Sequence, residues 1–504
     1  MSEPRDLVVG TLTGGPTAVL RDPSVVEPVG AGWSVEWWIG AEDRWHRPLV
    51  ESTTRQTSLP GAPIVETAVR VPGGDVTART AGVMGPGATT WTVIEVTNRS
   101  AVPVALGWTI QGASSGLGPG VLHRIDGRRV VLGRSPRSIE VPSDLIAGTE
   151  DLGGAVAVQP LAHTSVAWLA IEGAEPATGN EAEELPTFPP LDRVVSGWAP
   201  FEEIGARLTI GDDGLQSAFR SAAAVVRLGG GIDLGTRDAA LAARAGALVG
   251  AATVGERHLG ALLAQRRRNG SVRADGTRGG SGGDDAATTV ASLRAWCASV
   301  WSGDAAADEL VLPIAAAATW LLKRSHPAGP DNDAIGVAVG EAIATLRANE
   351  QVDAGDALIR LLDKATRSSA PTSNGGTARR APRDTGGSAS AAARRAVTRA
   401  AMQCADGVDL LVGVDADGVE LLAGWSPNWW GRAIEAHAVP TPWGALSFAL
   451  RWHGDRPALL WEILDAPPTL VIHAPRLDAA WRGTGAVGEE LLGAIERPVM
   501  ASFS

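Results

Sequence analysis

The sequence predicts a multidomain protein of α and β structure, with an N-terminal β-sandwich, a central domain of helical hairpins and a small C-terminal β-domain. Three observations lead to this prediction. Short runs of Val, Thr and Trp between Gly and Pro turns fill residues 1–205, Ala- and Leu-rich helical segments follow in 206–405, and strand-like runs return in 406–504. Because strands and helices come in separate runs, we do not expect a doubly wound α/β sheet.

The N-terminal region, residues 1–205, is predicted to form an antiparallel sandwich. Short strand-like runs occur at 33–39, 64–71 and 90–98, and turn signals such as Pro72–Asp75 separate them. Towards the end of the region the chain becomes rich in Pro and acidic residues, which indicates an irregular connection to the next domain.

The central region, residues 206–405, is predicted to be a helical domain. Its connections are mostly short, which favours antiparallel helical hairpins. We expect Asp213 and Thr236 to cap the first two helices. The predicted helices lie near 214–228, 236–250, 254–268, 284–302, 306–324, 333–348, 352–366 and 389–405.

Two connections in this region are long and rich in Gly and Arg, at 269–283 and at 367–390. The second also contains Ser and Pro and is predicted to be flexible. The C-terminal region, residues 406–504, returns to β character, with strand-like runs that include 410–414 and 446–452.

The composition limits the partners that the chain can have. The formal net charge of −12 and the pI near 5.3 argue against nucleic acid, because binding to phosphates requires a basic face. No apolar stretch approaches the roughly 18 residues of a membrane helix, so we expect no membrane partner. The sequence leaves the oligomeric state open.

Cofactors and metals are not expected. No two His residues have the spacing of a metal site, and the Gly-rich stretches lack the strand and the Lys of a phosphate-binding loop. The absence of Tyr excludes a Tyr nucleophile or acid. The start of the chain lacks a secretory pattern, and Cys297 and Cys404 cannot form a disulfide framework, so we expect a cytoplasmic protein.

Several local motifs carry a resemblance to a known family. They are Thr236–Ala240 at a helix start, Gln265–Val272 in a turn, Asp284–Asp285 before a helix that ends at Trp301–Asp304, and the C-terminal stretch Pro440–Glu462. Together with the order of β, helical and β regions, they resemble the bacterial glucoamylase-like glycosidases of actinobacterial type. The resemblance implies an (α/α)6 toroid of six hairpins, in which Arg237 and Asp238 hold the sugar.

The sequence also departs from this family. About eight helical segments stand where a toroid has twelve, so the helical domain is predicted to be shortened. The loop with aromatic residues that bears the family's general acid has no clear match. The corresponding stretch, 326–349, contains Asp331, Asp333 and Glu341 but no aromatic residue. Most of the 18 Trp residues lie in the two β regions.

Hydrolysis of a glycosidic bond requires two carboxyl groups, one as acid and one as base. We take Asp285 and Glu341 as the candidate catalytic pair. Asp285 could instead cap a helix, and Glu341 could be an ordinary exposed residue of a helix. Arg237 should lower the pKa of Asp238, which suits Asp238 to binding sugar hydroxyls, although it could simply be a carboxylate at a helix start.

Tryptophan is the abundant aromatic residue that could form a platform for a sugar ring. Trp296 is the candidate within the helical domain. Of the adjacent pair Trp37 and Trp38, one side chain is expected to be exposed or at an interface, because neighbours on a strand point to opposite faces. Packing between domains is the alternative for this pair and for the cluster at 425–430.

The sequence therefore predicts a glucoamylase-like, carbohydrate-active protein that binds an oligosaccharide or glycoside and has lost catalysis. The alternative is an active inverting hydrolase of α-glucosides, in which Asp285 and Glu341 transfer protons while Arg237 and Asp238 bind the sugar. The substrate itself is left open.

Overall fold

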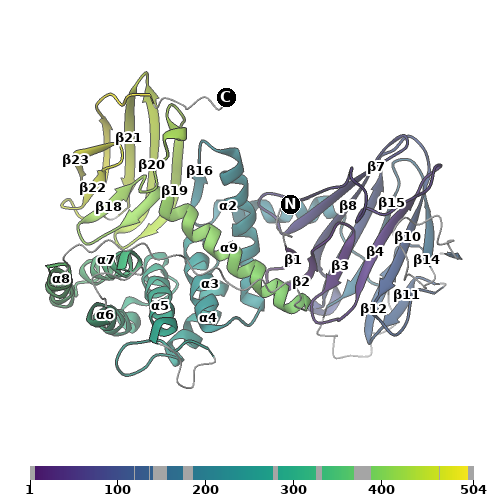
Figure 1. Ribbon diagram of the computed structural model, residues 1–504, viewed down its shortest axis with the longest axis horizontal. Coiled ribbons are helices and arrows are strands. Elements are labelled where there is room, and N and C mark those ends of the chain that lie inside the picture. The colour runs from purple at the N-terminus through teal and green to yellow at the C-terminus, as the bar shows by residue number, and fades with distance from the viewer. Residues whose placement is uncertain are drawn as a thin grey trace. The chain divides into compact units, whose positions relative to one another are not determined.

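The structure is a computed structural model, and its strands lie towards both ends of the chain while its helices lie in the middle (Figure 1). This confirms the predicted order of β-rich, α-rich and β-rich regions. Among the described residues, no helix is long and apolar enough to span a membrane. The structure describes residues 6–118, 120–134, 137–139, 156–173, 185–275, 282–324, 332–367, 388–464 and 466–497.

The chain divides into two compact units. The first consists of Met1–Phe201 and Arg383–Val397, and the second of Glu202–Pro382 and Thr398–Ser504. The second unit therefore contains both helices and the C-terminal strands. The predicted borders of three domains, at 205/206 and 405/406, remain predictions.

The first unit contains two antiparallel sheets among its described residues, one of eight and one of seven strands. The eight-stranded sheet has the order β1-β2-β3-β4-β10-β14-β13, with β5 paired to β4, and the other has the order β11-β12-β15-β9-β8-β7-β6. The strands of the first sheet are β1 (Leu7–Thr11), β2 (Gly15–Leu20), β3 (Val25–Pro28), β4 (Ser34–Gly40), β5 (Trp45–His46), β10 (Val104–Gln111), β13 (Arg137–Ile139) and β14 (Val156–Leu161). Those of the second are β6 (Arg55–Ser58), β7 (Ile64–Val71), β8 (Gly74–Met84), β9 (Thr90–Asn98), β11 (Leu122–Ile125), β12 (Arg128–Leu132) and β15 (Val166–Glu172).

The two sheets contribute to one hydrophobic core. Trp37 and Trp108 face each other across β4 and β10, and both belong to the same buried cluster as Ile94 of the other sheet. The sequence suggested that one of Trp37 and Trp38 is exposed or at an interface. Both rings are buried, so neither is exposed. The guanidinium of Arg47 lies 5.8 Å from the centre of the Trp38 ring.

The second unit begins with a short strand, β16 (Arg207–Thr209), and continues with helices. The helices are α2 (Asp213–Val226), α3 (Thr236–Val249), α4 (Ala252–Ala264), α5 (Gly282–Ser302), α6 (Ala307–Arg324), α7 (Asn332–Ala348), α8 (Val352–Arg367) and α9 (Ala389–Leu411), and the border between the units falls within α9. α3 packs against α4 and α5, α5 against α6 and α7, and α7 against α8. The helices thus pair as hairpins, with α3, α5 and α7 in a row.

The C-terminal strands form two sheets of five and four strands among the described residues. The first has the order β16-β19-β20-β21-β24 and contacts α3 and α5, and the second has the order β17-β18-β22-β23 and contacts α7 through β17. β16 precedes all the helices of this unit in the sequence yet pairs with β19, which ties the two ends of the unit together. The strands are β17 (Val412–Val414), β18 (Gly418–Leu421), β19 (Ile434–Thr441), β20 (Gly444–His453), β21 (Arg456–Ile463), β22 (Val471–Ala474), β23 (Asp478–Thr484) and β24 (Val487–Leu491).

Several local predictions need correction. The carboxylate that caps α2 belongs to Asp212, which accepts the backbone N–H of Leu215 at 3.0 Å, and not to Asp213. α4 ends at Ala264 rather than near 268, because the chain turns there into the isolated bridge between Arg266 and Val272. Of the segment predicted to be flexible, 367–390, residues 368–387 lie outside the described residues.

Candidate functional site

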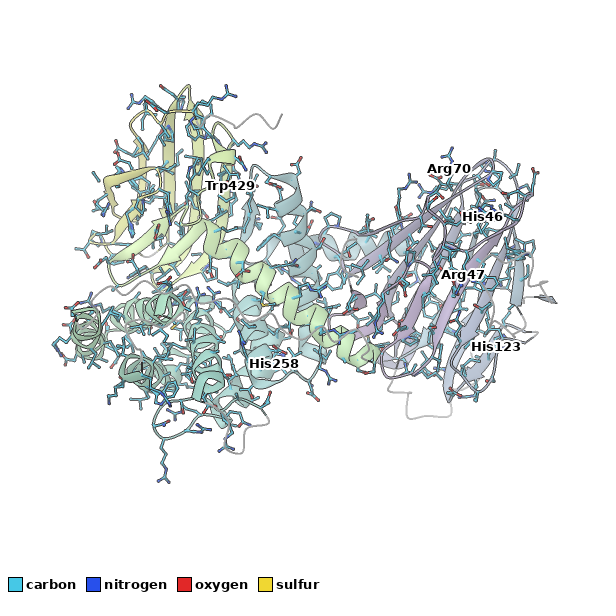
Figure 2. The ribbon with its side chains drawn as sticks, in the orientation of Figure 1. His46, Arg47, Arg70, His123, His258 and Trp429 are labelled. Atoms are coloured by element: carbon cyan, nitrogen blue, oxygen red, sulfur yellow. The ribbon has the colours of Figure 1, made fainter. Side chains whose placement is uncertain are left out.

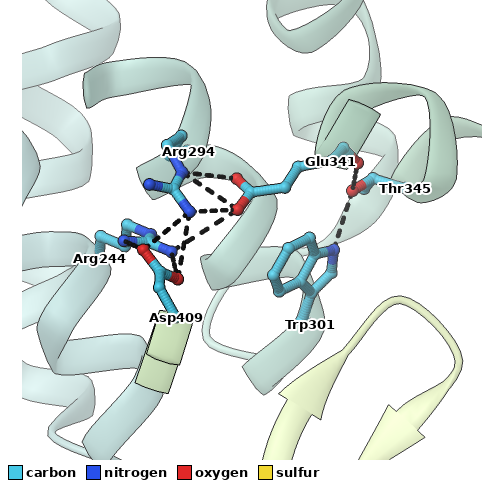
Figure 3. Close-up of polar contacts among 6 residues, drawn as sticks. All are labelled: Arg244, Arg294, Trp301, Glu341, Thr345 and Asp409. Carbon is cyan, nitrogen blue, oxygen red and sulfur yellow. Dashed lines mark hydrogen bonds and ion pairs between the residues drawn. The ribbon is translucent and has the colours of Figure 1, made fainter. Parts of the chain in front are cut away.

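Four helices of the second unit each direct one charged side chain to the same point. Figure 2 draws the side chains on the whole ribbon. Arg244 comes from α3, Arg294 from α5, Glu341 from α7 and Asp409 from the last turn of α9 (Figure 3). We call these four residues the charge cluster. In α3, α7 and α9 the other buried side chains are mostly apolar, whereas α5 also buries Thr and Ser side chains such as Thr288 and Ser292.

The shortest contacts of the cluster join Arg294 and Glu341. Nε of Arg294 donates to both carboxylate oxygens of Glu341 at 3.0 Å, and Nη2 donates to Oε1 at 2.5 Å. Glu341 has only 3% of its side chain exposed. Our alternative interpretation of Glu341 as an exposed helical residue was therefore wrong, because α7 turns this side chain inward towards α5.

Asp409 completes the cluster from the other side. Nη1 and Nη2 of Arg244 donate to its two carboxylate oxygens at 3.1 and 2.6 Å, and Nη2 of Arg294 approaches them at 3.2 and 3.1 Å. Nη2 of Arg244 also lies 3.6 Å from Oε1 of Glu341. Two guanidinium groups thus alternate with two carboxylates, which balances the charge of the buried groups.

The electrostatics of the cluster favour the ionised forms of Asp409 and Arg294. Burial alone would raise the pKa of Asp409, but Arg244 and Arg294 together hold that pKa below its usual value. Burial would likewise lower the pKa of Arg294, yet Glu341 and Asp409 raise it well above its usual value. Neither group is therefore placed to give up or take a proton near neutral pH.

A hydrogen-bonded chain behind Glu341 fixes the helix that carries it. The indole N–H of Trp301 on α5 donates to the hydroxyl of Thr345 at 2.8 Å, and this hydroxyl donates to the backbone carbonyl of Glu341 at 2.7 Å (Figure 3). The chain joins α5 to α7 one turn beyond the cluster, so it limits how far Glu341 can move relative to Arg294.

A pocket of about 490 Å³ opens beside the charge cluster. α7 forms one wall and the β17–β18 hairpin forms the other, with small apolar residues such as Val337 and Val414 between the polar groups. Its charged lining consists of Arg294, Asp333, Glu341, Asp409, Asp415 and Glu420. This combination of carboxylates with one guanidinium can accept and donate hydrogen bonds to a polar ligand.

Asp285, the other predicted catalytic carboxyl group, lies near the start of α5 and is held by the preceding turn. Its carboxylate accepts Nη1 of Arg267 at 2.5 Å and the backbone N–H of Ala274 at 3.0 Å. Although burial acts to raise the pKa of Asp285, these two partners hold it below its usual value. α5 begins three residues earlier, at Gly282, so Asp285 does not act as the N-cap.

The predicted sugar-binding pair lies at the start of α3, where Arg237 is exposed and Asp238 is partly buried. Burial raises the pKa of Asp238, and the opposing effect of Arg237 is smaller. Arg237 acts to lower this pKa as expected, but burial outweighs it, so the predicted net lowering was wrong. The predicted cap of α3 also differs, because Thr236 donates both its N–H and its hydroxyl to the carboxylate of Asp275.

The structure brings together only some of the predicted site residues. Glu341 lines the pocket, whereas Arg237, Asp238, Asp285 and Trp296 are not among the residues that line it. The ring of Trp296 has no exposed surface and packs in the core of the helices, so we do not include it in the site. Asp331 lies outside the described residues.

Among the residues that the structure describes, no group of three or more His, Cys, Asp and Glu side chains is arranged to hold a metal ion. Asp415, which lines the pocket, has its Oδ2 atom 3.3 Å from Nε2 of His473.

Known proteins give no further guide to the site. No model of a known protein family matches the chain, and no curated protein matches it either. Any assignment of function therefore depends on the residues and their geometry.

Three residues of the cluster, Arg244, Arg294 and Asp409, were missed by the sequence reasoning. Each is a charged residue within an apolar helical stretch, as in Leu241–Val249 around Arg244. Such residues are buried only when they are paired, so an Arg at a core position is a signal that a carboxylate lies opposite. The sequence does not identify which carboxylate that is.

Proposed function

We propose that this protein is a glucoamylase-like carbohydrate-binding protein in which hydrolysis has been lost. In this proposal the two sheets of the first unit form the β-sandwich of that family, and the paired helices of the second unit are a shortened (α/α) toroid. The ligand is an oligosaccharide or glycoside, and a cytoplasmic location is part of the proposal. One observation carries it, namely that arginines hold both predicted catalytic carboxylates.

This pairing is incompatible with the proton transfers of an inverting hydrolase. The general acid of such an enzyme must be protonated before reaction, which requires a raised pKa. The pKa of Asp285 is instead lowered, since Arg267 and the N–H of Ala274 stabilise its anion. Glu341 is engaged by the guanidinium of Arg294 through both oxygens, so it has little freedom to bind a water molecule.

The pocket beside Glu341 supports a binding role. Its volume of about 490 Å³ lies within the usual range for small-ligand sites, which is roughly 300–1,000 Å³. Carboxylates on two walls can accept hydrogen bonds from sugar hydroxyls, and the exposed part of Arg294 can donate to them. A rigid charge cluster keeps these groups in place without the ligand, which reduces the cost of ordering them on binding.

One observation favours the alternative, an active inverting hydrolase. Burial raises the pKa of Asp238, which is the property expected of a general acid. If the sugar bound at the start of α3, Asp238 rather than Asp285 would then protonate the leaving oxygen. The assignment of Arg237 and Asp238 as sugar ligands remains a prediction in either case.

Calorimetric titration with maltose and maltotriose, followed by a hydrolysis screen on α-glucosides, tests the proposal. We expect saturable binding, and no release of glucose by the wild-type protein. Glu341→Gln should weaken binding, whereas Glu489→Gln, on the exposed strand β24, should not. Absence of binding would refute the proposal, and glucose release that is lost in Asp238→Asn would establish the alternative.

A further inference from the structure

The pocket beside the charge cluster contains more negative than positive charge. One arginine, Arg294, lines it together with five carboxylates. Arg244 behind the wall adds a second positive charge through its contacts with Asp409 and Glu341. The two arginines therefore balance two of the five carboxylates, and three remain to be accounted for: Asp333, Asp415 and Glu420.

Of these three carboxylates, Asp415 has the most hydrogen-bond and charge partners. It accepts the backbone N–H groups of Asp417 and Gly418 at 2.8 and 2.9 Å and lies 3.3 Å from His473. Burial acts to raise its pKa, but these partners hold the pKa below its usual value, so the group is ionised at neutral pH. Its charge is thus compensated within the hairpin that carries it.

Asp333 and Glu420 have no side-chain partner of this kind, although Asp333 lies at the positively polarised start of α7. Among the residues that the structure describes, neither makes a hydrogen bond or an ion pair with another side chain or with the backbone. Asp333 stands in the first turn of α7 and Glu420 on β18, so the two carboxylates come from opposite walls of the pocket. A neutral sugar bound in the pocket would offer neither carboxylate an opposite charge.

Arg294 supplies an independent requirement on the ligand. Its Nε and Nη2 atoms are used by Glu341 and Asp409, whereas Nη1 makes no hydrogen bond to any described residue (Figure 3). Only 19% of the side chain is exposed, and that side chain lines the pocket. A ligand that fills the pocket must therefore bring a hydrogen-bond acceptor for Nη1.

We propose that the pocket selects an amino sugar, a polyhydroxylated ring with a protonated amine, over the neutral sugar of the same shape. The ammonium group pairs with Glu420 and Asp333, and a ring hydroxyl accepts from Nη1 of Arg294. This inference rests on the proposed function and names the ligand class of the same site.

Calorimetric titration with glucosamine, glucose and N-acetylglucosamine tests the inference at about pH 6, where amines and carboxylates with ordinary pKa values are both charged. We expect glucosamine to bind roughly three- to tenfold more tightly than the other two, which corresponds to one partly exposed ion pair. Glu420→Gln should remove most of this preference, and Glu489→Gln, an exposed residue outside the pocket, should leave it unchanged. Asp333→Asn provides a second variant if Glu420→Gln does not fold.

The outcomes separate this inference from the function on which it rests. Equal binding of glucosamine and glucose would overturn the inference while the proposed binding function stands. If maltose and maltotriose do not bind, the proposed function fails and the inference with it. If putrescine, a diamine without hydroxyl groups, binds as tightly as glucosamine, the pocket does not recognise a sugar and the inference is overturned.

Discussion

Glu341 lies between two guanidinium groups, and these neighbours decide what its carboxylate can do. A glutamate that transfers protons is usually kept in an apolar place that raises its pKa. Glu341 is just as buried, but its Oε1 atom lies 2.5 Å from Nη2 of Arg294 and 3.6 Å from Nη2 of Arg244. Burial alone does not indicate catalysis, because the sign of the effect depends on the charges that are buried with the group.

Removal of Glu341 should be costly to stability. Glu341→Ala leaves Arg294 and Arg244 without part of their compensation in a buried place, and we expect a loss of about 3 kcal/mol in the free energy of unfolding. The measurement is urea denaturation followed by Trp fluorescence. Asp356→Ala is the matched control, because it breaks the exposed pair with Arg347 and should cost less than about 1 kcal/mol. Equal losses in the two variants would contradict the buried pairing.

Asp285 gives a second prediction, which depends on pH. Its pKa is lower in the folded than in the unfolded chain, so the stabilisation is present above the unfolded value of about 3.9 and disappears as the pH falls through the folded value. Asp285→Asn should therefore lower stability by about 1–2 kcal/mol at neutral pH and by much less near pH 3. Glu489→Gln serves as the control. If Asp285→Asn lowered the free energy of unfolding by the same amount at both pH values, the charge of Asp285 would not contribute to stability.

The pairing of these residues is what sequence reasoning could not supply. Asp285 and Glu341 were predicted as site residues because hydrolysis requires an acid and a base, and both are carboxyl groups in the helical region. Their partners lie 18 and 47 residues away in the sequence, at Arg267 and Arg294, and the fold alone brings them together. Motif spacing therefore located carboxylates but not the charges that determine their chemistry.

At the scale of elements, the turn between α4 and α5 makes more specific contacts than its sequence indicated. Its first residues were predicted to be helical and the rest to be a long, Gly-rich connection, yet Arg266 and Val272 form a bridge and the turn supplies the partners of Asp285. The helices were predicted well because apolar spacing is a local signal, although both predicted capping residues were wrong. The turn depends on contacts with α5 and α6, which such signals do not contain.

Gly270 allows this turn to lie against α6. Its φ of +95° is unfavourable for other residues, and a Cβ atom there would overlap the backbone carbonyl of Ala316. Gly270→Ala should lower the free energy of unfolding by about 1–3 kcal/mol. Gly260→Ala on α4 is the control, because its Cβ meets nothing within 4 Å and Ala favours helix by about 0.5–1 kcal/mol. Similar effects of the two substitutions, in size and sign, would refute the role of Gly270.

At the scale of the whole molecule, the order of β-rich, α-rich and β-rich regions followed from composition, since strand and helix signals occupy separate stretches. The grouping of these regions did not follow. β16 at the start of the second unit pairs with β19, more than two hundred residues later, so the helices and the C-terminal sheets belong to one unit. The sequence of a strand of three residues does not predict its partner, because pairing depends on residues that are distant in the sequence.

The carboxyl groups whose pKa is shifted together determine how stability depends on pH. They divide into two sets by the direction of the shift. In the first, hydrogen bonds and ion pairs lower the pKa, in some cases against an opposing effect of burial: Asp43, Glu51, Asp285, Asp409, Asp415 and Glu435. In the second, burial raises the pKa: Glu27, Glu95, Asp238, Asp304 and Asp406. The two sets have opposite effects on stability as the pH changes.

These two sets predict a maximum of stability at mildly acidic pH. As the pH falls from neutral, the carboxyl groups with raised pKa take up protons more readily in the folded chain, so stability increases. Below the ordinary carboxyl pKa of about 4, the groups with lowered pKa lose the ion pairs that favour the fold, and stability falls. Urea midpoints measured between pH 3 and 8 by the fluorescence of the 18 Trp residues should therefore peak at about pH 4–6. If stability rose steadily up to pH 8, the pKa values of the buried carboxyl groups would not be raised in the folded chain. If stability stayed constant down to pH 3, the pKa values of the paired carboxyl groups would not be lowered.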